Sequence, residues 1–225
     1  DEWQHLGPAG REVAEGVLLA REASVNELLA GLETGRMQPA ELSAGGRQRL
    51  LMHKLSPVQS RARRLFQDVL SEDRGKVVDA FKAALSPDGN VSKGRDHFIA
   101  RCAACHQLGD LGRTIGPDLK TITNRSREDL LVSLLDPDRS VEPRYLGYTA
   151  VLDGGESVYG MITTETANSI VMKLMDGSER IIARPALKTI SSTGKSAMPA
   201  GLEAGLKHAD IGDLLAFIRQ QLALN

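Results

Sequence analysis

Aromatic residues and cysteines are both scarce in this sequence of 225 residues, which contains 4% aromatic residues and 2 cysteines. With so few aromatic side chains, we expect a hydrophobic core built mainly from Leu, Val, Ile and Ala. The cysteines lie three positions apart, and a disulfide across so short a loop would constrain the unfolded chain very little. Two cysteines also exclude a disulfide framework and a four-cysteine zinc site.

Long apolar runs and an excess of one charge are missing as well. No run approaches the roughly 18 consecutive apolar residues of a membrane-spanning helix, so we expect no membrane span. The formal net charge of -1 gives no electrostatic reason to expect a nucleic-acid partner or an anionic membrane surface. With 41% hydrophobic and 25% charged residues, the composition indicates a folded chain rather than a disordered one.

The first segment, residues 1–88, has the pattern of short helices joined by turns. Ser56 and Pro57 provide an N-cap and a first-turn proline, and apolar residues then recur at helical spacing. Residues that suggest catalysis or ligand binding are missing from these helices. The segment resembles the end of a HEAT-like helical solenoid, and we expect it to be a remnant of one.

Residues 145–192 change to the pattern of β-strands. Asp153–Gly155 is the tight turn of one predicted hairpin and Asp176–Gly177 is the tight turn of a second, and a fifth strand follows. The predicted strands are Tyr145–Leu152, Ser157–Thr163, Ser169–Met175, Glu179–Ile182 and Leu187–Ser191. Five short strands joined by tight turns predict a small SH3-like or Sm-like barrel.

The residues on either side of these strands again have helical patterns. Residues 89–144 contain predicted helices before and after a glycine-rich loop, and residues 193–225 end in a helix with one apolar face. The sequence therefore predicts a mainly α protein in four segments. These are the helices of 1–88, the helical part 89–144, an inserted β module over 145–192 and the helical end 193–225.

The clearest motif is Cys102-Ala-Ala-Cys105-His106. Two cysteines followed at once by histidine are typical of covalent haem c attachment, and His106 would then be the proximal ligand of the haem iron. A CxxC pair alone fits a redox or zinc site equally well, but no thioredoxin-like βαβ pattern surrounds this pair. We therefore predict one covalent haem c per chain, held by Cys102, Cys105 and His106.

Two further residues are candidates for the ligation of this haem. The carbonyl of Pro117, in the loop after the motif, is the predicted acceptor for the second imidazole nitrogen of His106. Met198 lies in a turn, precedes a proline and belongs to no apolar stripe, which favours it as the distal iron ligand. The four other histidines are expected at the surface: His5, His53, His97 and His208.

These residues together resemble class I cytochrome c. Residues 93–102 are similar to the N-terminal helix of that family, residues 116–119 to its proximal loop and residues 214–218 to its C-terminal helix. The resemblance implies a class I cytochrome c helical fold in which Phe217 packs over Gly94 where these two helices cross.

The resemblance covers roughly residues 91–140 and 192–225, so the β module departs from the family pattern. More narrowly, the chain resembles the C-terminal haem-binding domain of large secreted proteins of planctomycetes and verrucomicrobia. This likeness implies a periplasmic or other extracytoplasmic location, and electrons accepted from a fused or partner dehydrogenase. It also implies that Asp1 is a processed or artificial start, because such a protein needs export.

The function implied by the resemblance is electron transfer by a protein that is not itself an enzyme. Two alternatives remain open. A haem-based sensor or ligand-binding module would use the β module as its recognition surface and would have a labile or absent methionine–iron bond. One domain of an enzyme would need its catalysis elsewhere, because these 225 residues contain no nucleophile triad, metal cluster or phosphate loop.

Overall fold

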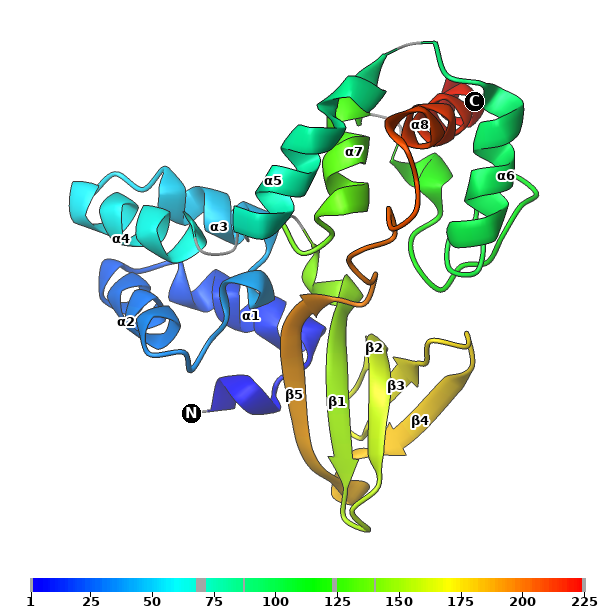
Figure 1. Cartoon of the computed structure of the whole chain (residues 1–225). Helices are drawn as coiled ribbons and strands as arrows, with labels where there is room; N and C mark the ends of the chain where they lie inside the picture. Colours follow the sequence, from blue (N-terminus) through cyan, green and yellow to red (C-terminus); the bar gives the residue numbers. More distant parts are fainter. Residues whose placement is uncertain (1, 68–71, 87, 123–124, 140, 224–225) are drawn as a thin grey trace. The chain divides into compact units, whose positions relative to one another are not determined.

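The computed structural model describes residues 2–67, 72–86, 88–122, 125–139 and 141–223 (Figure 1). The chain divides into two compact units. The first unit consists of residues 1–70, 140–174 and 178–197, and the second unit consists of residues 71–139, 175–177 and 198–225.

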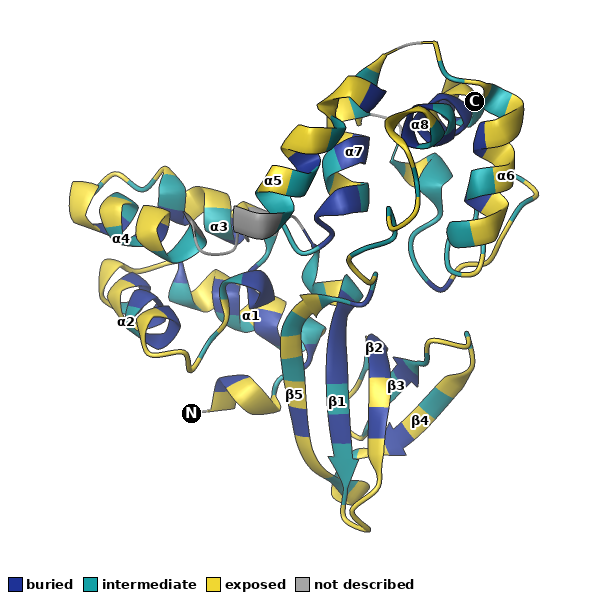
Figure 2. Ribbon diagram, viewed as in Figure 1, coloured by how far each residue is buried: buried dark blue, intermediate teal, exposed yellow. Residues whose placement is uncertain are grey.

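The first unit begins with helices, as the sequence predicts. Their bounds are η1 Glu2–His5, α1 Pro8–Leu18, α2 Glu22–Glu33, η2 Pro39–Glu41, α3 Ala44–Leu51 and α4 Ser56–Gln67. α4 begins at Ser56 itself, so Pro57 lies in the first turn as predicted, whereas Ser56 is a helical residue and not the predicted N-cap before the helix. Val58 and Ala62 belong to one core cluster with Leu28 and Leu29. Figure 2 marks the buried and exposed residues of these helices. A HEAT-like repeat finds no support in the described residues, where the helices α1 to α4 are 8–12 residues long and only α2 and α3 are separated by a 3-10 turn.

The five predicted strands are confirmed, and they form one antiparallel sheet. The strands are β1 Leu146–Leu152, β2 Ser157–Glu165, β3 Ser169–Lys173, β4 Glu179–Ala183 and β5 Leu187–Ser196, in the order β4-β3-β2-β1-β5. The 3-10 turn η6 Arg184–Ala186 joins β4 to β5, but in the described strands these two do not pair, so the sheet is open rather than a closed barrel. The mainly α prediction is therefore corrected to α plus β, because the strands build a full five-stranded layer with its own core.

A buried polar network within the first unit joins its helices to its sheet. Arg11 of α1 lies 2.6 Å from Glu41, whose second oxygen accepts a hydrogen bond from the Trp3 indole at 2.9 Å. The Arg11 guanidinium also lies 5.5 Å from the ring centres of Trp3 and of Tyr148 on β1. Arg11, Glu41 and Tyr148 are 2%, 5% and 0% exposed, so each charge depends on these partners for solvation.

A carboxylate of the sheet also caps the first long helix. Glu165, at the end of β2, accepts hydrogen bonds from the backbone of Gly7 at 3.0 Å and of Gly10 at 3.3 Å. Gly7 is the N-cap residue of α1 and has no side chain to supply this bond. Glu165 therefore satisfies the free N–H groups, and its negative charge interacts favourably with the positive end of the helix dipole. The structure thus groups the β-strands with the N-terminal helices, whereas the sequence pattern divides them into separate segments.

The second unit is helical. It contains α5 Glu72–Ala80, η3 Phe81–Leu85, α6 Val91–Arg101, η4 Leu119–Thr121, α7 Arg127–Leu135 and α8 His208–Ala223. The predicted close approach of two helices at Gly94 is confirmed. A Cβ added to Gly94 would clash with the carbonyl of Asp213 and would lie 2.8 Å from Cβ of Phe217, and the rings of Phe98 and Phe217 are 5.7 Å apart. This crossing fixes α6 against α8.

Replacing Glu41 with Gln is expected to destabilise the first unit by about 3 kcal/mol, because the substitution leaves the buried Arg11 charge without its counter-ion. Glu33→Gln is the matched control, since Glu33 pairs with Arg61 at the surface, and we expect it to cost less than about 1 kcal/mol. Urea unfolding followed by the fluorescence of Trp3, the single tryptophan, measures both. Equal losses in the two variants would contradict the importance of the network.

Stability should also depend on Tyr148 at alkaline pH. Burial raises the pKa of Tyr148 to about 12, above the value near 10 of an unfolded tyrosine. The contribution of Tyr148 is therefore intact below about pH 10 and is lost at roughly 1 kcal/mol per pH unit as the pH rises towards 12. Urea unfolding of the native chain and of Tyr148→Phe between these pH values tests this, and parallel losses in the two proteins would refute it.

Candidate haem-binding site

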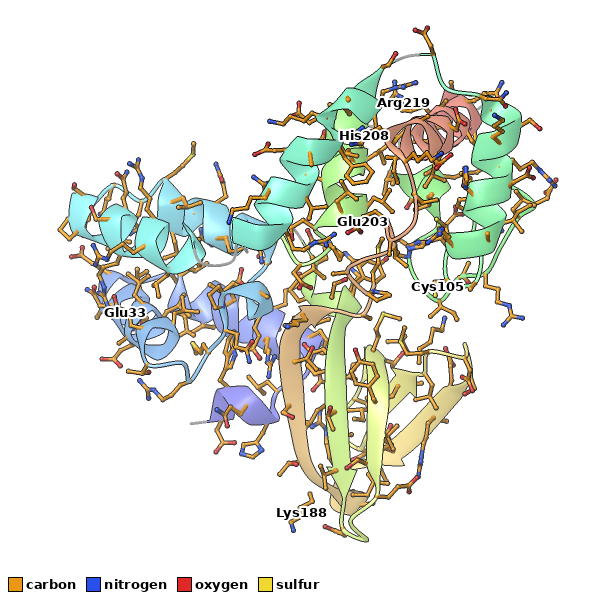
Figure 3. All side chains as sticks on the ribbon, viewed as in Figure 1. Glu33, Cys105, Lys188, Glu203, His208 and Arg219 are labelled. Carbon is orange, nitrogen blue, oxygen red and sulfur yellow. The ribbon has the colours of Figure 1, made fainter. Side chains whose placement is uncertain are left out.

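The two cysteines and the histidine lie in one tight turn directly after α6. The amides of Cys105 and His106 donate to the carbonyl of Cys102, at 3.0 and 2.8 Å. The turn therefore places Cys102, Cys105 and His106 in one short segment at the end of the helix (Figure 3 labels Cys105). Cys102 is 8% exposed and Cys105 is half-buried, and both thiols are free.

The imidazole of His106 is held by backbone groups of the following loop. Its Nδ1 lies 2.9 Å from the carbonyl oxygen of Pro117. A carbonyl only accepts, so Nδ1 carries the proton and Nε2 keeps its lone pair. Burial lowers the pKa of His106, although the contact with Pro117 opposes this shift. The side chain is thus a neutral imidazole with one nitrogen suited to metal ligation.

Two glycines allow the loop to approach the motif this closely. A Cβ on Gly116 would lie 2.7 Å from Cε1 of His106, and a Cβ on Gly112 would clash with the His106 carbonyl. Gly112 also has a φ of +85°, which other residues rarely adopt. The amides of Ile115 and Gly116 donate to the carbonyl of Cys105, at 3.0 and 2.7 Å. The loop is therefore fixed to the motif through its backbone.

This donor set fits a covalently bound haem. Two free thiols and a neutral Nε2 are the groups that attach a haem c and bind its iron from one side. Burial raises the pKa of the Cys102 thiol to about 11, so at neutral pH this group is a thiol rather than a thiolate.

Met198 lies in the same unit as His106. It is half-buried and occupies the segment between β5 and α8, in a bend rather than in a helix or strand. The structure thus places the predicted distal residue on a loop of the haem-binding unit.

Residues that the sequence reading missed anchor this loop. Arg101, next to Cys102, donates to the carbonyl of Leu202 at 2.9 Å, and Arg74 of α5 forms a salt bridge with Glu203 at 2.9 Å. The sequence carries no signal for these contacts, because their partners are about a hundred or more positions apart.

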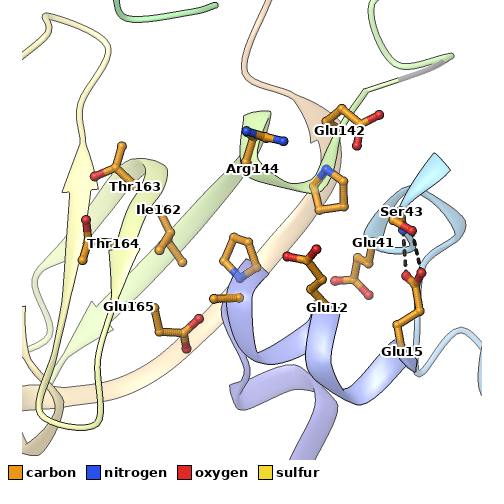
Figure 4. Close-up of a pocket in the computed structure, with 13 residues that line it drawn as sticks. Glu12, Glu15, Glu41, Ser43, Glu142, Arg144, Ile162, Thr163, Thr164 and Glu165 are labelled. Atoms are coloured by element: carbon orange, nitrogen blue, oxygen red, sulfur yellow. Dashed lines mark hydrogen bonds between the residues drawn. The ribbon is translucent and has the colours of Figure 1, made fainter. Parts of the chain in front are cut away.

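A second candidate site, a pocket of about 340 Å³, lies in the first unit (Figure 4). Its walls carry several carboxylates, and three of these are engaged by the protein itself. Glu15 accepts hydrogen bonds from the backbone and hydroxyl of Ser43, at 2.7 and 2.5 Å, Glu41 pairs with Arg11, and Glu165 caps α1. These carboxylates therefore serve the fold of the first unit.

Comparison with known proteins supports the haem assignment. Residues 91–142 match the family model described as Cytochrome c, a segment that includes α6, the cysteine–histidine turn, the Pro117 loop and α7. No curated protein matches the chain. The match supports a cytochrome c domain and implies covalent haem c and a haem-based electron carrier. Within the described residues, no helix combines the length and apolar character needed to cross a bilayer.

Gly116→Ala should disturb the proximal side of the site, because its new methyl group would push the His106 ring away from Pro117. We expect a loss of roughly tenfold or more in the fraction of chains that carry haem, the range typical for residues that orient a metal ligand. The control is Gly75→Ala on α5, where an added Cβ meets nothing within 4 Å. Haem content per chain, measured by pyridine haemochrome absorbance, distinguishes the two, and equal loading would contradict the proximal role of this loop.

Proposed function

We propose that this chain transfers single electrons through one haem c, bound covalently by Cys102 and Cys105. His106 is the proximal iron ligand in this proposal, and Met198 is the distal one. The observation that carries the proposal is the contact of His106 Nδ1 with the Pro117 carbonyl, because it leaves Nε2 as the nitrogen available to a metal, in the same turn as two free thiols. The match of residues 91–142 to the Cytochrome c model supports it.

When bound, the haem would supply one-electron redox chemistry, and His106 and Met198 are the residues that would hold its iron. The protein contributes a fixed imidazole, since the Pro117 carbonyl and the backbone of Gly116 leave His106 little freedom to rotate. Met198 contributes a neutral thioether, which favours the ferrous state and raises the reduction potential. The half-buried position of Met198 suits a ligand that excludes water from the iron.

We also propose that the electrons come from a dehydrogenase, either fused to this chain or a separate partner. The location is proposed to be periplasmic or otherwise extracytoplasmic, where covalent haem attachment of this type takes place. The resemblance to haem-binding domains of large secreted proteins supports both proposals. We propose no catalysis by this chain itself, because its conspicuous reactive groups, the two thiols and the imidazole, are used for the haem.

Met198→Ala tests the distal ligand. In the oxidised protein we expect the methionine-to-ferric-iron absorption band to disappear and the reduction potential to fall, because an open or water-filled position no longer favours the ferrous state. Met52→Ala is the matched control, since Met52 is 71% exposed and belongs to the first unit. Visible spectra and potentiometric titration provide the measurement.

A band that persists in Met198→Ala would refute this ligand assignment. Rapid binding of CO by the unmodified ferrous protein would refute the carrier proposal and favour a haem sensor, because a filled sixth position slows the entry of an external ligand.

A further inference from the structure

Arg74 of α5 connects three segments of the second unit. Its Nη1 and Nη2 donate to the two carboxylate oxygens of Glu203, at 2.9 and 3.0 Å. Its Nε donates to the carbonyl of Leu135 at 2.6 Å, and Nη2 donates to the same carbonyl. One guanidinium therefore holds the last residue of α7 and the loop before α8, in the two-pronged geometry that only arginine provides.

The pair is more than a surface salt bridge. The side chains of Arg74 and Glu203 are 21% and 13% exposed, so water screens their attraction only in part. The hydrogen bonds from Arg74 hold the pKa of Glu203 below its ordinary value. Leu135 ends α7, and a cation at the carbonyl end of a helix is favoured by the helix dipole.

The loop that receives these contacts has local turn hydrogen bonds, from the amide of Ala204 to the carbonyl of Gly201 at 3.0 Å and from the amide of Leu206 to the carbonyl of Glu203 at 2.8 Å. Residues 198–207 form bends and turns without a helix or strand. Gly201 and Gly205 have φ values of +90° and +77°, and glycine loses more conformational freedom on ordering than other residues do. The position of such a loop depends on tertiary contacts.

Two arginines supply these contacts at neighbouring residues of the loop. Arg101 binds the carbonyl of Leu202 at 2.9 Å, and Arg74 binds the side chain of Glu203 (labelled in Figure 3). The loop is thus fixed four and five positions after Met198. Arg101 precedes Cys102 directly, whereas Arg74 comes from α5, outside the segment 91–142 that matches the Cytochrome c model.

We propose that Arg74 is a positioning residue for the distal haem ligand. By holding Glu203 against the end of α7, it fixes the loop in the place from which Met198 binds the iron. This proposal rests on the proposed His/Met ligation. It gives α5 a part in the chemistry of the haem site, although α5 supplies no ligand.

The test compares Arg74→Gln and Glu203→Gln in the haem-loaded full chain. Each substitution is expected to lower the equilibrium constant for methionine ligation by roughly fivefold to thirtyfold, the effect of losing a charge-assisted bond. Arg74→Lys keeps the charge but not the two-pronged geometry, and should lie between the native protein and Arg74→Gln. Asp79→Asn is the control, because Asp79 lies on the same helix and pairs with Lys82 at the surface.

Three measurements report on ligation rather than on folding alone. These are the amplitude of the methionine-to-ferric-iron band, the rate of CO binding to the ferrous protein and the reduction potential. A weaker band, faster CO binding and a lower potential in both Gln variants, with native values for Asp79→Asn, support the proposal. Hydrogen exchange of residues 198–207 provides a readout independent of the haem spectrum and should be faster in both Gln variants.

The outcomes separate this inference from the function on which it rests. Native values in both Gln variants, together with loss of the band in Met198→Ala, would overturn the role of Arg74 while leaving His/Met ligation intact. A band that survives Met198→Ala would overturn the ligation itself, and the positioning role with it.

Discussion

His106 presents Nε2 for metal binding because its Nδ1 is committed to the carbonyl of Pro117 at 2.9 Å. This contact sets the tautomer and the ring orientation of His106, whereas burial of the ring favours its neutral state by lowering the pKa. It depends on backbone geometry at both ends, since the loop is fixed to the Cys105 carbonyl and passes the imidazole at a glycine. A side chain at position 116 would occupy the space that the ring now fills.

The same unit relies on close backbone approach a second time. Gly94 lets α6 lie directly against the backbone of α8 at Asp213, and the cysteine–histidine turn follows α6 without an intervening loop. The orientation of α6 therefore determines where the turn presents its thiols. Arg101, which binds Leu202, and Arg74, which binds Glu203, extend this arrangement to the loop that carries Met198. Backbone contacts order the loop beside His106, and charged side chains order the loop that carries Met198.

The first unit uses a different physical solution. Its helices and sheet meet through Arg11, Glu41 and Tyr148, a network with almost no exposure to water. Buried charges of this kind cost desolvation energy, and they are tolerated when every polar atom has a partner. Among the described residues, no buried side-chain nitrogen or oxygen is without a partner. The network stabilises one arrangement of helices and strands over others, because a displaced partner would leave a charge unsolvated.

The sequence by itself determined the local features. Cys102, Cys105 and His106 are adjacent in the chain, so their chemistry could be recognised without a fold, and alternating patterns and Asp–Gly turns located all five strands. Pro57 located the first turn of α4 for the same reason, since the preference for proline there acts within a few residues. Pro117 lies only 11 positions from His106, close enough for its loop to be recognised as a partner.

The tertiary structure decided which segments belong together. Glu165 and Gly7 are 158 positions apart, and Arg74 and Glu203 are 129 apart. The sequence around an arginine or a glutamate does not identify its ion-pair partner, because any residue of opposite charge could form the pair. The sequence therefore suggested an isolated β module and a separate helical segment before the haem motif. Folding instead joined the sheet to α1 through Glu165 and placed α5 in the haem-binding unit, where Val78 belongs to the core. These partners are close in space although they are far apart along the chain.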